Sequence, residues 1–137
     1  MIISLDLPHV FYPGSNPRED AFALRIMLDT LIRLNMAFLR DHRVPNLYDS
    51  GVRYGRTQVW DTIPALYRRT YGDCKSLTAA LVAERRFAGK AAEPVFRWIQ
   101  NPDGSKDYHI LVGIGRGQFE DPSKILGMNQ YNTTLRA

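Results

Sequence analysis

Apolar residues recur at helical spacing once the chain has passed an early turn rich in Pro, Gly and Asn. The apolar positions that share this spacing are Leu24, Met27, Leu28, Leu31, Leu34 and Phe38. They predict a helix that buries one stripe and runs to about Arg40. Asn16 or Ser15 can cap this helix, and Pro17 suits its first position. Before the turn, residues 2–7 indicate either a short edge strand or an extended arm.

A second helical pattern begins at the only cysteine of the chain. Asp73 stands at the expected N-cap and Cys74 at the first helical position. Leu77 and Leu81 then repeat on one face until Gly89 ends the helix. Alanines between them raise the helix propensity and allow close packing. The pattern therefore predicts a buried helix with a cysteine at its N-terminus.

The chain between these two helices has no sustained period over residues 44–56, which contain Pro, Asn, Asp, Ser and two glycines. Irregular connections of this length are often binding surfaces. The side chains that either line a substrate groove here or anchor a solvated loop are Tyr48, Arg53, Tyr54 and Arg56. A short helix is expected over residues 62–70, with Asp61 or Thr62 as its cap.

After Gly89 the period of the apolar positions changes to two. Residues 92–100 and 107–115 both alternate, and the turn-forming residues 101–105 separate them. These two segments predict an antiparallel hairpin. A glycine-rich turn then returns the chain into a third short strand at residues 118–121.

The order of the elements predicts the fold class. Pro122 ends or bends the last strand, and the residues after it show no strong pattern. Helices come first and a sheet meander follows, which is typical of an α+β fold. We therefore expect N-terminal helices, with the cysteine helix packed on a small antiparallel sheet.

Length and composition indicate one soluble domain. The chain has 137 residues, of which 45% are hydrophobic and 23% charged, so we expect a single domain over residues 1–137. Its first residues lack a basic start, and no apolar run approaches the length of a membrane span. The expectation is a cytoplasmic protein with no membrane partner.

The net charge of +4 is a mild bias, with 18 Lys and Arg against 14 Asp and Glu. Such a bias favours nucleic acid or an acidic polypeptide by long-range attraction. The basic residues are scattered along the chain instead of forming a block, so a solvated surface explains them. A nucleic-acid partner is not expected.

The single cysteine is a free thiol, because no intrachain disulfide can form. A lone cysteine is most often a small buried hydrophobe. At a helix N-terminus, however, the helix dipole favours the thiolate, and the unpaired backbone N–H groups can bind an oxyanion. Cys74 therefore meets the first condition for a nucleophile, and a nearby imidazole would meet the second.

Among the three histidines, His109 is the best placed to act as a base. It lies in the middle of a predicted strand, and a rigid strand holds a base better than a terminus does. His9 lies in the N-terminal arm. His42 lies at a helix exit, where a positive end-cap role explains it.

The candidate acceptor that orients His109 is Asp121, on the adjoining strand. A turn centred on Gly115 would place Asp121 directly opposite His109 in the hairpin. A tight two-residue turn after Gly115 would instead pair Asp121 with Val112. The alternative acceptor is Glu120, whose side chain is expected on the other face of the sheet.

Cys74, His109 and Asp121 together predict a Cys-His-Asp triad. Each of them taken alone is structural more often than catalytic, but a helix-start Cys, a strand His and a next-strand Asp seldom coincide by chance. One cysteine with no close pair of ligands falls short of a zinc site, so no metal and no cofactor are expected.

The chain resembles the transglutaminase-like superfamily, in particular its small bacterial cysteine peptidases with a papain-type triad. The resemblance is carried by G-D-C opening a helix at residues 72–74, by Y-H in a strand at 108–109 and by D-P at 121–122. It covers about half of the chain. The resemblance implies a transglutaminase-like, papain-like fold.

Further features extend this resemblance, and others depart from it. Family members carry a Trp and then a Pro shortly before G-D-C, and Trp60 and Pro64 fill that pattern. This implies that Trp60 lines the site, and a core anchor is the alternative. Ser76 stands where the family commonly has an acidic residue, and the segment between Gly89 and His109 is short.

The resemblance implies amide chemistry. Cys74 would attack a peptide or carboxamide carbonyl, His109 would shuttle the proton, and Asp121 would orient His109. Residues 50–54 and 120–128 resemble small proteins of tailed bacteriophages, which implies a phage-encoded cysteine peptidase or amidase with a polypeptide substrate, in the host cytoplasm or the virion. The alternative is a catalytically silent structural or assembly protein of a virion, with a phage structural protein as partner.

Overall fold

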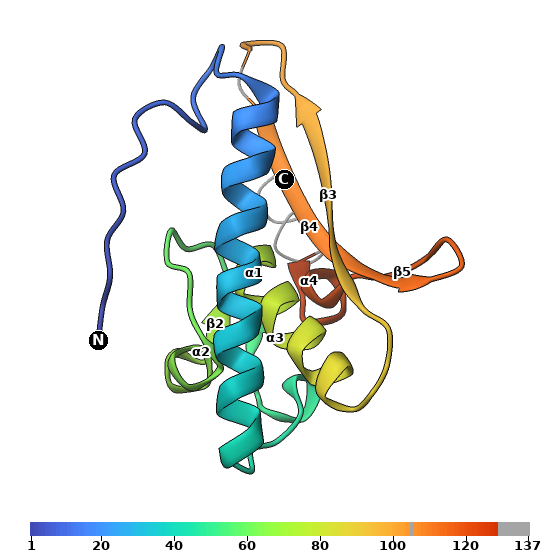
Figure 1. The fold of residues 1–137 in the computed structure, drawn as a ribbon. Coiled ribbons are helices and arrows are strands. Elements are labelled where there is room, and N and C mark those ends of the chain that lie inside the picture. The colour runs from blue at the N-terminus through green and yellow to red at the C-terminus, as the bar shows by residue number, and fades with distance from the viewer. Residues whose placement is uncertain (105, 129–137) are drawn as a thin grey trace.

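The computed structural model describes residues 1–104 and 106–128, in which helices mix with two small sheets (Figure 1). The helices are α1 (Pro17–Asp41), the 3₁₀ turn η1 (Leu47–Asp49), α2 (Ile63–Arg69), α3 (Cys74–Phe87) and α4 (Pro122–Ile125). The strands are β1 (Arg53–Tyr54), β2 (Tyr71–Gly72), β3 (Glu93–Gln100), β4 (Lys106–Gly115) and β5 (Gln118–Glu120). The predicted α+β class is confirmed.

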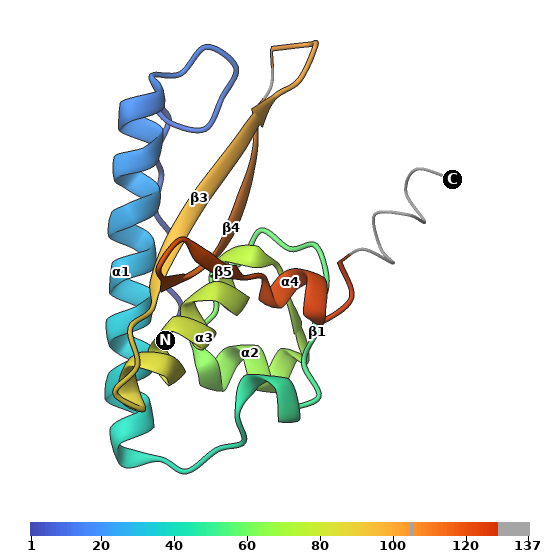
Figure 2. The same ribbon diagram turned by 90° about the vertical axis from the view of Figure 1, so that its right-hand side faces the viewer.

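α1 spans the length of the molecule and packs against α3 (Figures 1 and 2). Its N-cap is Asn16, whose side chain accepts a hydrogen bond from the Arg18 N–H at 2.8 Å. The predicted stripe is wrong at one position, since Leu34 is 54% exposed and Asn35 is buried in its place. The Asn35 side chain accepts a hydrogen bond from the Ile63 N–H at 2.8 Å, so it holds the first turn of α2 against α1.

A two-stranded parallel sheet, which the sequence patterns did not predict, lies next to the start of α3. Tyr54 on β1 pairs with Gly72 on β2, and the Gly55 N–H donates to the Gly72 carbonyl at 2.9 Å. The expected short helix is α2, with Thr62 at its N-cap. Because β2 runs into α3 through a single residue, the sheet holds residues 53–55 beside the N-terminus of α3.

The predicted antiparallel hairpin is β3–β4, and β5 extends it into a three-stranded sheet. The register of β4 with β5 differs from both predicted registers. Val112 lies opposite Glu120, and β5 ends there, so Asp121 lies outside the ladder. The expected pairing of Asp121 with His109, and the alternative pairing with Val112, are therefore both wrong.

A β-bulge explains this register. Gly115 pairs with Gln118 across a two-residue turn, whereas Gly113 pairs with Phe119, so Ile114 is one extra residue on β4. Both residues of the turn have a positive φ, at 56° and 70°, which suits the twist of a tight hairpin. The sequence signalled the turn through its glycines but not the bulge.

The hydrophobic core joins α1, α3 and the sheet. All residues from 76 to 83 on α3 are buried. Other fully buried side chains are Leu28, Ile32, Leu47, Val52, Ile63, Leu66 and Val112. This burial fixes the position of α3, and with it the position of its first residue.

Both ends of the chain refine the sequence expectations. Residues 2–7 form no strand, and Ile2 and Ile3 are exposed in an extended arm that lies apart from the rest of the molecule (Figure 1). The segment after β5 turns into α4 at Pro122, where only the end or a bend of a strand was expected. Residues 129–137 of the predicted patternless tail lie outside the described residues. No helix in the described ranges is both long enough and apolar enough to cross a membrane.

Candidate active site

α3 presents Cys74 at its N-terminus, as predicted. Asp73 is the N-cap: its side chain accepts from the Lys75 N–H at 3.2 Å, and its carbonyl accepts from the Leu77 N–H at 3.0 Å. Cys74 is a partly buried free thiol. The first N–H groups of a helix have no intrahelical acceptor and carry the positive end of the dipole, so this position favours a negative charge.

His109 on β4 lies between Asp121 and Cys74. Its Nε2 is 2.6 Å from Oδ2 of Asp121, and the Cys74 side chain interacts with the same ring. Since Nε2 faces the carboxylate, Nδ1 is the nitrogen left for the sulfur. The His109 and Asp121 side chains are 29% and 15% exposed. The structure therefore gathers the three residues of the predicted triad around one imidazole.

These contacts shift the protonation of the pair. The hydrogen bond with Asp121, followed by the interaction with Cys74, raises the pKa of His109 to about 9, although burial acts to lower it. Burial acts to raise the pKa of Asp121, but the hydrogen bond and charge of His109 outweigh it and hold this pKa below its ordinary value. At pH 7 the pair is an imidazolium bound to a carboxylate.

Asp121 reaches His109 from the N-terminus of α4 and not from the ladder. Its Oδ1 accepts hydrogen bonds from the Ser123 N–H at 3.1 Å and the Lys124 N–H at 3.3 Å, so Asp121 is the N-cap of α4. Its Oδ2 is the atom that faces His109. The cap geometry thus replaces the strand pairing that the sequence suggested.

Glu120, the alternative acceptor, bonds elsewhere. Its two carboxylate oxygens accept from Nη2 of Arg85 at 3.0 and 2.9 Å, and Oε2 also accepts from the Tyr48 hydroxyl at 2.7 Å. Glu120 therefore ties β5 to α3 and η1, on the face away from His109, where the sequence placed its side chain.

The other two histidines lie at the expected places. His9 is exposed in the N-terminal arm. His42 follows α1, where its Nδ1 lies 3.1 Å from the Phe38 carbonyl and its ring stacks on that of Phe38 with centroids 4.3 Å apart. These contacts give His42 an end-cap role.

Trp60 lies in the irregular segment between β1 and α2. Its ring is partly buried against the core, and the Lys75 ammonium lies 5.7 Å from the ring centroid. The described contacts of Trp60 do not include Cys74 or His109. The ring is therefore a core contact that also touches the residue next to Cys74, and its role in lining the site is a prediction.

Tyr54 is a neighbour of Cys74 that the sequence did not connect with it. Burial, followed by electrostatic interactions with Cys74 and Asp73, raises the pKa of Tyr54 above its ordinary value. The sequence singled out Tyr54 only as one aromatic residue of an irregular segment. Its place beside Cys74 depends on the parallel pairing with Gly72. Strands of two residues are too short for a sequence pattern to predict this pairing.

Two further residues were not predicted to belong to the site, and one of them, Ser76, stood out only as a departure from the family pattern. Lys75 and Ser76 both contact the segment that carries Trp60. Burial raises the pKa of Asp73 although Lys75 pairs with it. The sequence signal that could have found these residues is the presence of polar side chains in the first turn of a helix that is otherwise buried.

Comparisons with protein-family models, with curated proteins and with solved structures found no match to this chain. The resemblance to the transglutaminase-like superfamily therefore stays a prediction from the residues that carry it. Over the described part of the chain, no group of three or more His, Cys, Asp and Glu side chains is arranged to hold a metal ion.

Proposed function

We propose that this chain is a thiol acyl-transfer enzyme with a transglutaminase-like fold. Cys74 is the nucleophile, His109 the acid and base, and Asp121 the residue that orients His109. The substrate is a peptide or carboxamide, and hydrolysis is the default outcome. The class of enzyme that we propose is a small phage-encoded cysteine peptidase or amidase.

The observation that carries this proposal is the position of His109 between a carboxylate and a thiol. Oδ2 of Asp121 lies 2.6 Å from Nε2 of His109, and this contact fixes the orientation of the ring. The other side of the ring interacts with Cys74 at the helix N-terminus. An orienting acid, a base and a nucleophile in this order are what thiol catalysis requires.

The reaction follows from these positions. The Cys74 thiolate bonds to the carbonyl carbon, and the oxyanion that forms can face the backbone N–H groups at the N-terminus of α3. The His109 imidazolium then gives its proton to the leaving amine as the C–N bond breaks, which leaves a thioester. A water molecule loses a proton to His109, attacks the thioester and releases the Cys74 thiolate.

The rate of alkylation of Cys74 by iodoacetamide, measured against pH, tests this proposal. Alkylation should stay fast well below pH 8.5, which is about the ordinary pKa of a free thiol, because the imidazolium of His109 stabilises the thiolate. In His109→Ala the same rate should fall at neutral pH. Cys74→Ser gives the blank, since the chain has one cysteine.

His42→Ala is the matched control, because His42 is an exposed histidine at the end of α1. It should show the pH profile of the unmodified protein. A profile in all variants that follows an ordinary thiol would overturn the proposal.

The second candidate is the catalytically silent structural or assembly protein of a virion. One observation favours it: the N-terminal arm exposes apolar side chains, with Ile2 at 95%, Ile3 at 72% and Leu5 at 67%. Exposed apolar segments of this kind are typical of surfaces that pack on a partner. This candidate predicts that Cys74 reacts as an ordinary thiol, so the alkylation profile separates the two.

A further inference from the structure

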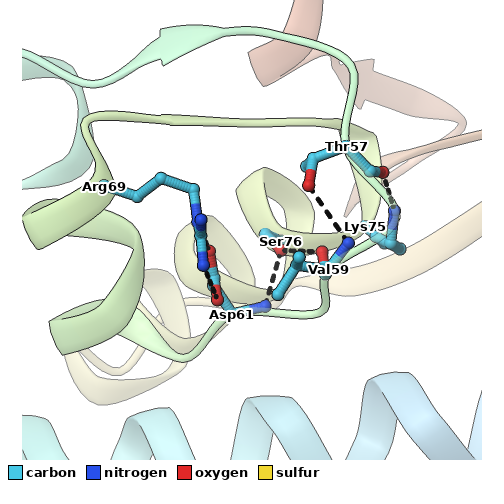
Figure 3. A network of polar contacts seen from close by, with 6 residues as sticks. All are labelled: Thr57, Val59, Asp61, Arg69, Lys75 and Ser76. Carbon is cyan, nitrogen blue, oxygen red and sulfur yellow. Dashed lines mark hydrogen bonds and ion pairs between the residues drawn. The ribbon is translucent and has the colours of Figure 1, made fainter.

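One hydroxyl bridges the two residues on either side of Trp60. The Ser76 Oγ accepts a hydrogen bond from the Asp61 N–H at 2.9 Å and lies 3.5 Å from the Val59 carbonyl, to which it donates (Figure 3). Ser76 is fully buried. The chain on both sides of Trp60 is therefore bound to the first turn of α3.

Lys75 binds the same segment from the adjacent position of the helix. Its Nζ donates to the Thr57 carbonyl at 2.8 Å (Figure 3). The same ammonium lies over the Trp60 ring and forms an ion pair with Asp73. The Lys75 side chain is only 12% exposed. A partly buried ammonium with three partners is a fixed contact and not a freely solvated charge.

The segment has two further side-chain contacts, one within it and one with α2. The Thr57 hydroxyl accepts from the Val59 N–H at 3.1 Å, and the buried carboxylate of Asp61 accepts from Nε of Arg69 at 2.7 Å. Figure 3 shows these bonds continuing the line of contacts from Lys75 and Ser76. Residues 57–61 thus have no helix or strand of their own, and side chains supply their order.

We propose that Ser76 and Lys75 are positioning residues, which clamp residues 57–61 onto the turn that carries Cys74 and so fix Trp60 beside it. This inference rests on the proposed function. Loops place side chains less accurately than helices do, unless packing and hydrogen bonds lock them. Because the clamp binds the loop to the same helical turn as the nucleophile, the two hold one relative position.

Trp60 fluorescence tests the clamp itself. The chain has two tryptophans, so Trp98→Phe leaves Trp60 as the only one, and Trp98 is exposed enough to accept the change. In this background, Ser76→Ala should give a red-shifted emission and a larger acrylamide quenching constant. Ser15→Ala is the control, because it removes a buried hydroxyl whose hydrogen bond is to Asp20, outside residues 57–61.

Two reactions of Cys74 test what the clamp does for catalysis. p-Nitrophenyl acetate acylates the sulfur, with p-nitrophenolate leaving as the thioester forms, whereas iodoacetamide alkylates it without a tetrahedral intermediate. Ser76→Ala should lower the acylation rate about tenfold or more, since small displacements at a reacting centre have effects of this size. Its alkylation rate and the pH profile of alkylation should not change.

Lys75→Gln provides a second variant in case Ser76→Ala fails to fold. It should have the same two effects, and Lys75→Arg, which keeps the cation, should restore both acylation and quenching toward the parent values. Equal quenching and acylation in Ser76→Ala and Ser15→Ala would overturn the clamp. A parallel fall of acylation and alkylation would also overturn it, because the substitution would then act on Cys74 itself.

These outcomes are separate from failure of the proposed function. If the parent protein is not acylated faster than a free thiol, and its alkylation does not depend on His109, the enzyme proposal fails. The quenching of Trp60 in Ser76→Ala then decides the clamp alone. Unchanged quenching would reject it.

Discussion

Asp121 divides its two carboxylate oxygens between His109 and the helix that follows. Oδ2 lies 2.6 Å from Nε2 of His109, and Oδ1 accepts from the N–H groups of Ser123 and Lys124 at the start of α4. One side chain therefore orients the imidazole and caps a helix. The negative charge of Asp121 acts on the imidazole, whereas the positions of its two oxygen atoms are needed for both the imidazole contact and the helix cap.

Asp121→Asn should separate these two tasks. Asparagine is as good an N-cap as aspartate, so any fall in the free energy of unfolding, at most about 3 kcal/mol at neutral pH, should come from the lost ion pair with His109 and not from the cap. Without the carboxylate, the pKa of His109 should fall from about 9 toward its ordinary value of 6.5. An NMR titration of the imidazole C–H protons measures this shift, and alkylation of Cys74 at pH 6 should slow with it.

Asp29→Asn is the matched control, because Asp29 is a half-exposed aspartate that pairs with Arg33 on α1. It should leave the titration of His109 unchanged. An unaltered His109 titration in Asp121→Asn would contradict the contact between Asp121 and His109.

The raised pKa of His109 also predicts how stability depends on pH. The folded protein binds this proton more tightly than the unfolded chain, so the stabilisation is complete below about pH 6.5 and is lost as the pH rises to about 9. The loss should be at most about 3 kcal/mol in the free energy of unfolding. Urea unfolding at intervals between pH 6 and pH 9.5 measures it.

His109→Gln removes the titrating group and should flatten this dependence over the same interval. If both proteins lose stability equally between pH 6.5 and pH 9, His109 is not the group responsible.

Glu120→Gln tests which acid serves His109. The substitution removes the charge that Arg85 and Tyr48 bind, so urea unfolding should show a loss of about 1–3 kcal/mol. The pH profile of Cys74 alkylation should stay that of the unmodified protein. A profile altered as strongly as in Asp121→Asn would mean that Glu120, and not Asp121, orients the base.

Thr70 at the end of α2 has a strained backbone. Its φ is 71°, in the left-handed region that a β-branched residue rarely adopts, while its N–H donates to the Leu66 carbonyl at 2.9 Å. Thr70→Gly should raise the midpoint of thermal unfolding, by an amount equivalent to about 0.5–1 kcal/mol. Gly89→Ala, at a φ of 79° with open space around it, should act in the opposite direction.

The elements that sequence predicted best are those whose signals are local. Asn16 and Asp73 cap their helices as the patterns indicated, because capping depends on the neighbouring residues alone. The exposure of Leu34 was missed because Asn35 takes its place in the stripe through a bond to a distant backbone N–H. β1 and β2 have two residues each, too few to show a period.

The candidate site combines local and distant information. The position of Cys74 and the choice of His109 followed from a helix start and a strand. The path of Asp121 to His109 did not, since it depends on a bulge and on a helix that begins at Pro122. The contacts of Lys75 and Ser76 with residues 57–61 also required the folded chain, because no sequence period relates an irregular loop to a helix.

The extra residue Ile114 also decides which acid the imidazole meets. With it bulged out, Glu120 shares the face of Val112, and Asp121 lies beyond the ladder within reach of His109. If Ile114 were instead paired in the ladder, the same tight turn would set Asp121 opposite Val112 and bring Glu120 to the face of His109. Surface turns usually accept insertions and deletions, and deletion of Ile114 would leave Glu120 opposite Val112, whereas a shift of the ladder that paired Ile114 would exchange the two acids.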